Sequence, residues 1–485
     1  MSLVMVAVLA LPAVGGLAAA TLRARTAAWA GTGFAAAALI AAASLPLSRS
    51  DGPLWHRLDL PWAEAIGLRF DLGVDGISYP LIVLTAMLTL LCCIHVLVTG
   101  TSRGGLLVAL LLAIELGILG VFLSMNLVAF FVFFEVVLLP MYAVIAFWGG
   151  PNRRHAAMKF ALYTVLGSLL LLVGVFIVVS GTGTGDIVAL TQSGGGGMSG
   201  GTQLLAFSLL AIGFAIKSPL WPLHTWLPDA HTEAPTVGSV ILAGVLLKMG
   251  TYGLIRVGLG VAPQGAEAAA GVLAVLAVAA IIIGALVCLV QTELKRLIAY
   301  SSVGHMGFVL LGIATMSSAG ISAALFGNIA HGLITGLLFF LVGTIKDTAG
   351  TGMLSRLGGL RDTAPRLAGV LGFAALASLG LPGLAGFWGE AFTVYAAFGQ
   401  FGRWGTTVAV LAALGAALAA AYLLRMLRKV SHGPPSPAVA GVDESTTVPQ
   451  VALWAPLVLA IVVFGTMPWL LLDGFAGPFL EWIAR

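Results

Sequence analysis

The stretch that decides the fold is IKSPLWPLHTWLPDAHTEAPTVGSVILAGVLLKMGTYGLIR, residues 216–256. Two apolar segments flank a polar break that contains four prolines. Each apolar segment carries one lysine well inside it, Lys217 in the first and Lys248 in the second. A lysine at the centre of a membrane span costs about 2.5–3.5 kcal/mol on insertion scales. Two such lysines beside a broken helix therefore indicate a protonatable path through a membrane.

The composition places nearly the whole chain in a lipid bilayer. Its 485 residues are 60% hydrophobic and only 9% charged, whereas a soluble domain carries about 25% charged residues. The net charge of +4 is no sign of nucleic-acid binding, because in a membrane protein the distribution of charge over the loops matters more. The three cysteines, Cys92, Cys93 and Cys288, lie in apolar runs. The sequence contains no CxxC motif, no nucleotide-binding fingerprint and no P-loop. We therefore expect no redox centre, cofactor or metal site in this chain.

Apolar stretches of about 20 residues recur along the chain and predict an all-α polytopic membrane protein. We count about fourteen transmembrane helices, at 2–22, 27–47, 76–99, 105–124, 127–148, 158–181, 203–226, 234–262, 268–290, 297–317, 320–345, 366–398, 406–428 and 451–472. The polar connection 48–75 can hold a short hairpin, the Gly/Ser-rich connection 182–202 predicts a flexible loop, and 430–450 is a polar loop.

Lysine and arginine are distributed unequally over the loops. Alternate loops hold 15 of the 23 basic residues, Lys295 and Arg296 among them as anchors at a span end, and the opposite side holds 6. The remaining two are Lys217 and Lys248. The 6 are Arg49, Arg57, Arg69, Arg256, Arg403 and Arg485. The positive-inside rule puts the larger group in the cytoplasm and, with fourteen spans, both termini outside.

Two of the predicted spans are interrupted by proline and glycine. One lies within 216–256 and the other within 366–398, around Pro382 and Gly383. Paired broken helices in two halves of a chain are typical of a transporter repeat. Five spans in each half predict two inverted five-helix repeats. The expected organisation is N-terminal helices in 1–104, a first repeat in 105–262, a second in 263–428, and a loop with a C-terminal helix in 429–485.

Ionisable side chains lie inside the predicted spans. Besides the two lysines they are Glu115, Glu135 and Glu390, with His224, His305 and His331 inside or near spans. Five central charges would cost about 12–18 kcal/mol to insert, which exceeds the net stability of about 5–15 kcal/mol of a typical domain. Such groups persist only if they pair with each other, face water or take part in function. A scaffold whose buried charges only pair between helices remains an alternative.

Spacing assigns partners to some of these groups. Lys217, Trp221 and His224 stand at i, i+4 and i+7, which is one face of a helix. Burial favours a neutral lysine and a nearby carboxylate favours a charged one. Withdrawing Glu135 from Lys217 would therefore release a proton, and a sodium path could use similar residues. Lys295 either anchors its span at the membrane surface or feeds a half-channel.

Four blocks of the sequence resemble a known family. They are KSPLWPLHTWLPDAHTEAPTVGSVILAGVLLKMGTYGLIR (217–256), FFEVVLLPMYAVIAFWGG (133–150), QTELKRLIAYSSVGHMGFVLLGI (291–313) and GLPGLAGFWGE (380–390). They are similar to the antiporter-like membrane subunits of respiratory complex I, the NADH-quinone oxidoreductase. This resemblance implies fourteen helices in two inverted repeats, with helices seven and twelve broken.

The resemblance also implies roles for single residues. Glu135 matches the helix-five glutamate that pairs with Lys217 of helix seven, and Lys248 matches the lysine of helix eight. Glu390 matches the terminal residue of helix twelve, which is a glutamate in the chain M branch and usually a lysine in sister subunits. Glu115 matches a further acid, while His305 and His331 match polar residues between the halves; with His224 and Lys295 they form the expected supporting polar axis.

The function implied is proton translocation in the inner membrane of a bacterial cell, driven by electron transfer from NADH to quinone in other subunits. The chain itself would bind no cofactor, and NADH, FMN, Fe–S clusters and quinone would belong to partner subunits. Its partners would be other complex I membrane subunits and membrane lipid, and no nucleic acid. The alternative is a subunit of an Mrp-type cation/proton antiporter or of a membrane-bound hydrogenase.

Overall fold

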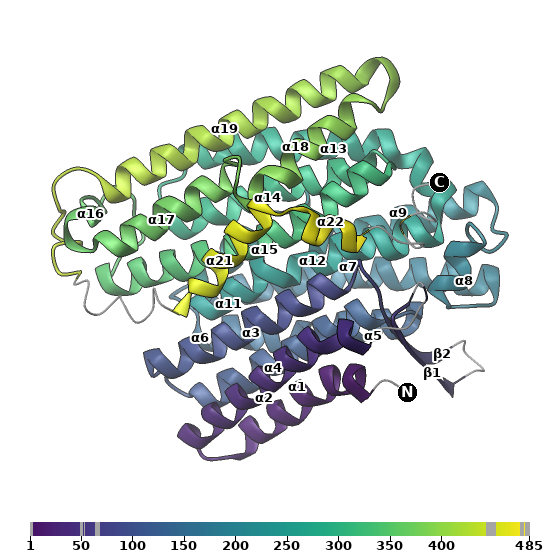
Figure 1. Cartoon of the computed structure of the whole chain (residues 1–485), viewed down its shortest axis with the longest axis horizontal. Coiled ribbons are helices and arrows are strands. Elements are labelled where there is room, and N and C mark those ends of the chain that lie inside the picture. Colours follow the sequence, from purple (N-terminus) through teal and green to yellow (C-terminus); the bar gives the residue numbers. More distant parts are fainter. Residues whose placement is uncertain are drawn as a thin grey trace.

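Long helices that lie side by side form almost the entire molecule (Figure 1). The computed structural model describes residues 3–48, 52, 54–63, 68–442, 453–475 and 480. Within these residues, twelve helices are long and apolar enough to cross a membrane, or thirteen if one bent pair counts as a span. The helical, membrane-spanning class is therefore confirmed, while the number fourteen and the inverted repeats stay predictions.

The first half contains the helices up to the first break. They are α1 (Leu3–Thr21), α2 (Ala24–Ser44), α3 (Tyr79–Thr99), α4 (Gly104–Leu123), α5 (Leu127–Val136) with α6 (Leu138–Trp148) as one span, α7 (Arg153–Thr182) and α9 (Gly200–Lys217). The Gly/Ser-rich connection after α7 is not merely a loop, because it contains the short helix α8 (Ile187–Gln192). The side chain of Asp186 caps α8 by accepting from the backbone N–H of Ala189.

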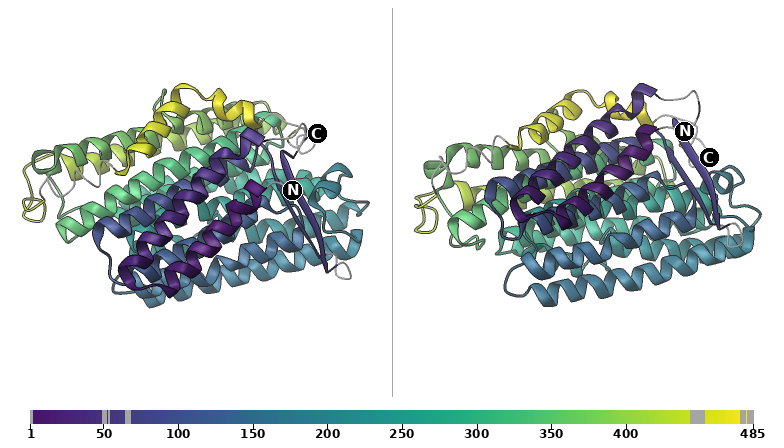
Figure 2. Two further views of the ribbon diagram at one scale, coloured as in Figure 1. Left: turned by 60° about the horizontal axis from the view of Figure 1, so that its bottom comes forward. Right: turned by 90° about the horizontal axis from the view of Figure 1, so that it is seen from below.

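The second half begins after the proline-rich break. It consists of α10 (Trp226–Glu233), the continuous span α11 (Thr236–Ile241), η3 (Leu242–Leu246), α12 (Leu247–Gly253) and η4 (Leu254–Leu259), then α13 (Pro263–Val290), α14 (Leu294–Ala314), α15 (Ser318–Ala349), α16 (Leu360–Thr363), α17 (Pro365–Ser378), α18 (Ala385–Phe398), α19 (Gly405–Ser431), α21 (Ala455–Thr466) and α22 (Trp469–Phe475). Figure 2 shows the same packing from two other sides.

A short antiparallel hairpin confirms the expectation for 48–75. Strand β1 (His56–Ala63) pairs with β2 (Leu68–Val74), with Leu58 opposite Leu72. Arg57 donates to Asp71 over 2.7 Å and contacts Asp186 at 3.2 Å, which ties the hairpin to the start of α8. The hydrogen bond to Asp71 raises the pKa of the Arg57 guanidinium above its ordinary value, so this connection stays charged.

Both expected breaks are present, but the first comes earlier than predicted. Helix α9 ends at Lys217, and residues 218–225 form turns instead of continuing to 226. The second break separates α17 from α18, where Gly380 and Gly383 adopt φ of +77° and +91°. L side chains rarely adopt these angles, so glycine is what allows the chain to turn there.

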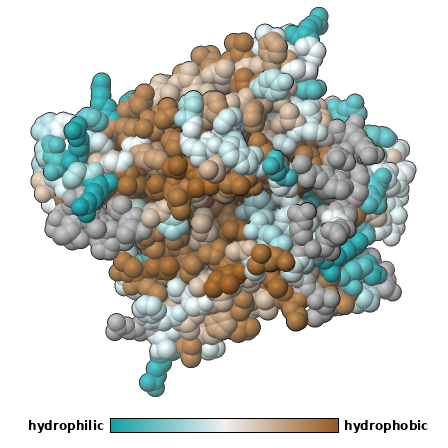
Figure 3. Space-filling view, viewed as in Figure 1, coloured by the Kyte–Doolittle hydropathy of each residue, from teal (hydrophilic) through white to brown (hydrophobic). Residues whose placement is uncertain are grey.

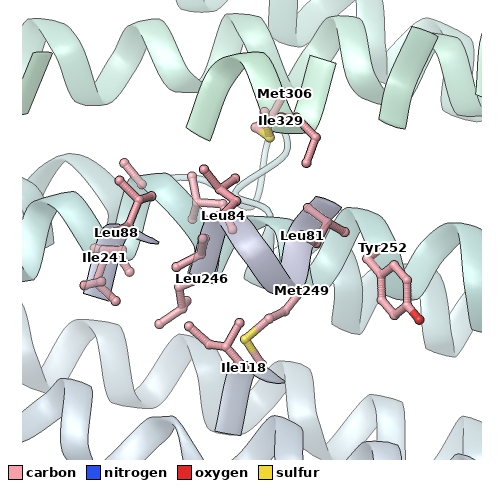
Figure 4. Close-up of a cluster of buried hydrophobic side chains, with 14 of the residues drawn as sticks. Leu81, Leu84, Leu88, Ile118, Ile241, Leu246, Met249, Tyr252, Met306 and Ile329 are labelled. Atoms are coloured by element: carbon pink, nitrogen blue, oxygen red, sulfur yellow. The ribbon is translucent and has the colours of Figure 1, made fainter. Parts of the chain in front are cut away.

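The centre of the molecule is apolar apart from the groups described below. Side chains from α3, α4, the α11–η4 span, α14 and α15 interdigitate there, among them Leu84, Ile118 and Met249 (Figure 4). The α11–η4 span and α15 are the most deeply buried of the spans. On the face shown in Figure 3, hydrophobic residues predominate in the middle and the most hydrophilic residues lie towards the edges. This distribution is the one expected of a protein that crosses a bilayer.

Two basic residues counted among the loops lie inside the helical bundle. Arg256 is fully buried in η4, and Lys295 is only 4% exposed in the first turn of α14. Assigning Arg256 to a loop was therefore wrong. Interpreting Lys295 as a surface anchor was also wrong. Without these two, 14 basic residues remain in the larger group of loops and 5 in the smaller, so the predicted orientation does not change.

Candidate functional site

The first break places Lys217 at a helix end in the interior. Lys217 is the last residue of α9 and is 2% exposed. The helix end is held by two hydrogen bonds: Trp226 Nε1 donates to the carbonyl of Ile216 over 3.0 Å, and Ser218 Oγ donates to that of Leu247 over 2.9 Å. The second bond joins the end of α9 to the residue before Lys248.

Glu135 and Lys217 lie in one region but make separate contacts. The Lys217 ammonium sits 4.7 Å from the centre of the Phe134 ring, a cation–π arrangement. The carboxylate of Glu135, at the end of α5, accepts a hydrogen bond from Ser168 of α7. The two charges interact electrostatically. Glu135 and Lys217, which were expected to pair, are thus neighbours that interact electrostatically, while Glu135 also contacts Ser168 and Lys217 also contacts Phe134.

Lys248 lies between two π-helical segments, η3 and η4, at the centre of the bundle. Wide turns of this kind loosen the backbone ladder and are frequent at functional sites. The Lys248 side chain is fully buried, and its Nζ donates to the carbonyl of Ala243 in η3 over 2.5 Å. It also lies 2.6 Å from Nδ1 of His331 on α15. The sequence-based expectation that Lys248 and His331 share one axis therefore corresponds to a direct contact.

Glycines bring these two spans together. A Cβ at Gly332, next to His331, would lie 2.6 Å from the carbonyl oxygen of Gly244 in η3. A Cβ at Gly244 would meet Leu88 and would be 3.6 Å from the carbonyl of Gly332. The two backbones therefore touch without an intervening side chain, which keeps Lys248 within reach of α15.

His305 of α14 continues the series toward Glu390. Its ring centre lies 5.7 Å from that of His331. Its Nδ1 is 2.7 Å from the carbonyl of Ser301, and its Nε2 is 2.9 Å from that of Ser378. Each ring nitrogen of His305 therefore faces a carbonyl oxygen, a group that only accepts hydrogen bonds. The Glu390 carboxylate, 12% exposed, lies 3.5 Å from the same Nε2.

A small cavity connects the last three groups. It has a volume of about 30 Å³ and is lined by His305, His331, Thr335, Ser378 and Glu390 among others. A cavity of this size holds a water molecule when polar groups surround it. The second break forms one wall, because Ser378 is the last residue of α17 and Glu390 lies in the second turn of α18.

Lys295 belongs to a second polar region, at the end of the bundle that carries the larger group of basic residues, here called the basic end. Its Nζ donates to the carbonyl of Ala234 over 3.0 Å, and Lys346, Asp347 and Glu293 interact with it electrostatically. A cavity of about 320 Å³ opens here, lined by Lys295, Lys346 and Asp347 among others. This arrangement favours the half-channel interpretation of Lys295.

Two expected members of the axis lie away from it. Glu115 is fully buried in α4, and its carboxyl oxygens have no hydrogen-bond partner among the described residues. It interacts electrostatically with Cys93 rather than with the lysines. His224 lies in the turn region beside Tyr300, with ring centres 6.0 Å apart. The shared helix face of Lys217, Trp221 and His224 was wrong, because α9 ends at Lys217.

Sequence reasoning missed three buried polar groups. His231 is fully buried, stacks on Phe339 with ring centres 4.4 Å apart, and interacts electrostatically with both Lys295 and Lys248. Thr251 donates to Asn328 over 2.8 Å, one turn from His331. Arg256 pairs with Asp75 at 2.6 Å. His231 stands in the quoted 216–256 block, so its position seven residues after His224 was the available signal.

A family model matches more than half of this chain. The model, "NADH:quinone oxidoreductase/Mrp antiporter, TM", matches residues 124–418, which include the lysines, His305, His331 and Glu390. The chain belongs to this family. Members of known sequence include the NADH-quinone oxidoreductase subunit M of Rickettsia conorii, 42% identical over 315 residues, which are 65% of this chain and 64% of that protein. The Rhodobacter capsulatus subunit M is 43% identical over 316 residues, 63% of this chain and 62% of that protein. The aligned part thus spans a little under two thirds of these relatives.

Solved structures of the family share the whole fold. A chain of respiratory complex I from Thermus thermophilus with bound NADH superposes with a TM-score of 0.89 at 30% identity, over 99% of both chains. A chain of the Mrp complex from Dietzia sp. gives 0.86 over 100% of both chains at 23% identity, a likeness of fold. The chain is therefore a multi-span membrane protein with the fold of both matched chains.

Proposed function

We propose that this chain is a membrane-arm subunit of a NADH-quinone oxidoreductase and moves protons across the membrane. The observation that carries the proposal is the series of protonatable groups from Lys248 and His331, which are buried, to His305 and Glu390, which are partly buried, with contacts of 2.6 Å at one end and 3.5 Å at the other. Lys217 and Glu135 stand at the neighbouring break. The similarity to subunit M chains supports the assignment to this complex.

The contacts define one transfer step. When Lys248 is protonated, its Nζ donates to Nδ1 of His331, 2.6 Å away, so the neutral ring then carries its proton on Nε2. Moving a proton from Nζ to Nδ1 leaves a neutral lysine and an imidazolium. Release of the Nε2 proton then returns the ring to its neutral form. Glu390 lines the same cavity and accepts a proton as a carboxylate.

The energy for these steps would come from partner subunits. We propose that NADH, FMN, Fe–S clusters and quinone are bound there, and that this chain holds none of them. Its own part would be to change the distance between Glu135 and Lys217, since the lysine is held near Phe134 and the glutamate by Ser168. The chain would lie in the bacterial inner membrane among sister antiporter-like chains and lipid, with its basic end in the cytoplasm.

Alanine variants test the proposal. Lys217→Ala and Glu135→Ala should each strongly reduce NADH-driven proton translocation in inverted membrane vesicles, while the assembled complex stays intact on a native gel. Lys248→Ala should also lower it. Arg428→Gln, an exposed basic residue of α19, serves as a control and should leave translocation unchanged. Normal pumping by Lys217→Ala and Glu135→Ala in assembled complex would refute the proposal and leave a scaffold with inactive charges.

A second candidate is a subunit of an Mrp-type cation/proton antiporter. The equally complete fold match to a chain of the Mrp complex favours it. The partners that co-purify with the tagged chain separate the two: subunits with Fe–S clusters and a quinone site support the oxidoreductase, and their absence together with Na⁺-dependent proton movement supports the antiporter.

A further inference from the structure

A basic cavity lies at the membrane surface, away from the buried axis. Its volume is about 620 Å³, and it is formed where the start of α4, the end of α6 and the start of α7 meet. Three arginines line it: Arg103, Arg153 and Arg154. Trp148 Nε1 donates to the carbonyl of Ser102 over 2.8 Å and so fixes the end of α6 against the turn before α4. A hydrogen bond from a side chain to the backbone therefore holds two walls of the cavity together.

The arginines of this cavity are not neutralised by carboxylates. Among the described residues, no carboxylate lines the cavity, and the ion pairs formed by these residues include none of Arg103, Arg153 and Arg154. One N–H of Arg153 donates to the carbonyl of Gly149 over 3.1 Å. Glu233 lies beyond the same loop, where it accepts from the backbone of Asn152 and lines the neighbouring cavity. Guanidinium groups without acids form a site for an anion, and phosphate matches their fork of donors.

The cavity is continuous with exposed apolar surface on α6 and α7. On α7, Arg154, Met158 and Leu162 follow each other at four-residue spacing on one face, all of them exposed, with Leu162 64% exposed. On α6, Phe147 is also 64% exposed beside Trp148. A molecule bound here would meet positive charge at the helix ends and apolar side chains one or two turns further into the membrane. Free phosphate uses only the first of these features.

We propose that this cavity binds the headgroup of an anionic phospholipid, with its acyl chains along α6 and α7. Basic pockets between membrane helices recognise such headgroups, and each lysine or arginine near a charged membrane surface contributes about 1 kcal/mol. The proposal is independent of the proton path, because none of the lining residues belongs to it. Its occupant is a lipid and not a protein, because arginines without carboxylate partners lie next to exposed apolar side chains of α6 and α7. A phospholipid has a phosphate for the first and acyl chains for the second.

Bound lipid measured by native mass spectrometry tests the site. The full chain is purified in mild detergent with its co-purifying partners, and phosphatidylglycerol or phosphatidylcholine is added. The variant Arg103→Gln/Arg153→Gln/Arg154→Gln should hold phosphatidylglycerol at least about ten-fold more weakly than the unchanged chain. Replacement of the same residues by lysine should restore part of the binding. The unchanged chain should prefer phosphatidylglycerol to phosphatidylcholine.

A matched control removes three charges elsewhere at the same end. Arg361→Gln/Arg428→Gln/Lys429→Gln changes exposed residues outside the cavity and should leave binding as in the unchanged chain. Gel filtration verifies that each variant is folded. Equal loss in the control, unchanged binding in the cavity variant, or full displacement of the lipid by excess inorganic phosphate would each overturn the proposal. So would loss of a co-purifying protein from the cavity variant with lipid binding intact, because the surface would then be a protein contact.

Discussion

Three basic side chains, of which Lys248 and Lys295 are buried and His305 is partly buried, contact backbone carbonyls at helix irregularities. Lys248 uses the carbonyl of Ala243 in a π-helical segment, Lys295 that of Ala234 at the end of α10, and His305 that of Ser378 at the end of α17. The last carbonyls of a helix lack an internal partner and carry the negative end of its dipole. At Ala234 and Ser378 the helix ends therefore supply carbonyls that stabilise positive charge, and these carbonyls act together with the nearby carboxylates Asp347 and Glu390.

Glu390 is the residue at which the proposed path leaves the second half. Glu390→Gln keeps the shape of the side chain and removes its ability to bind and release a proton. We expect proton translocation to fall by about ten-fold or more, measured by fluorescence quenching in inverted vesicles. Glu390→Asp should retain part of the activity. A glutamine variant that pumps as well as the unchanged protein would rule out a proton on Glu390.

The buried pair of Arg256 and Asp75 is expected to stabilise the bundle. Arg256→Met leaves the Asp75 carboxylate buried, where its Oδ1 still accepts from the backbone of Ile77 and Ser78. Removing one partner of a buried pair costs about 3–5 kcal/mol, so the unfolding temperature of the variant in detergent should fall. Arg256→Met/Asp75→Asn should recover part of the loss. Additive effects of the two single changes would show that the pair is not coupled.

At the scale of elements, the end of α9 is fitted against α12 through Gly250. A Cβ at this position would meet Ser218 Oγ and would lie 2.6 Å from the carbonyl of Phe214. The helix that carries Lys217 and the one that carries Lys248 are thus spaced by a glycine.

Gly250→Ala should therefore destabilise the protein and change the spacing of the two lysines. Overpacking of this kind costs about 1–3 kcal/mol, which thermal unfolding in detergent detects. Gly271→Ala in α13 is the matched control, because its Cβ meets nothing within 4 Å. It should leave stability unchanged or slightly raised. Equal effects of the two changes would contradict the close fit at Gly250.

The elements also separate what the sequence predicts from what only the fold reveals. Prolines, glycines and apolar runs predicted both breaks and the hairpin, because these features act locally. The π-helical segments around Lys248 have no such signal, since their residues are ordinary helix formers. The sequence does not reveal the burial of Arg256 and Lys295, because both residues lie near the ends of predicted spans. The groups that they contact, Asp75 and the carbonyl of Ala234, are 181 and 61 residues away along the chain.

At the scale of the whole molecule, the uneven distribution of basic residues predicts sidedness. A cysteine at Arg361, between α15 and α17, should react with a membrane-impermeant maleimide in inverted vesicles but not in intact cells. A cysteine at Trp62 in β1, which is 67% exposed, should show the opposite pattern. The native Cys92, Cys93 and Cys288 are buried and should give a low background. The reverse labelling pattern would contradict a cytoplasmic basic end.

The touching backbones at Gly244 and Gly332 restrict how this sequence can drift over evolutionary time. Any residue other than glycine at 332 would push its Cβ to 2.6 Å from the carbonyl of Gly244, and the two spans would separate there. A lineage could accept that change only if Lys248 or His331 were lengthened, shortened or exchanged as well. A substitution at Gly332, which carries no ionisable group, should therefore be accompanied by a change at Lys248 or His331.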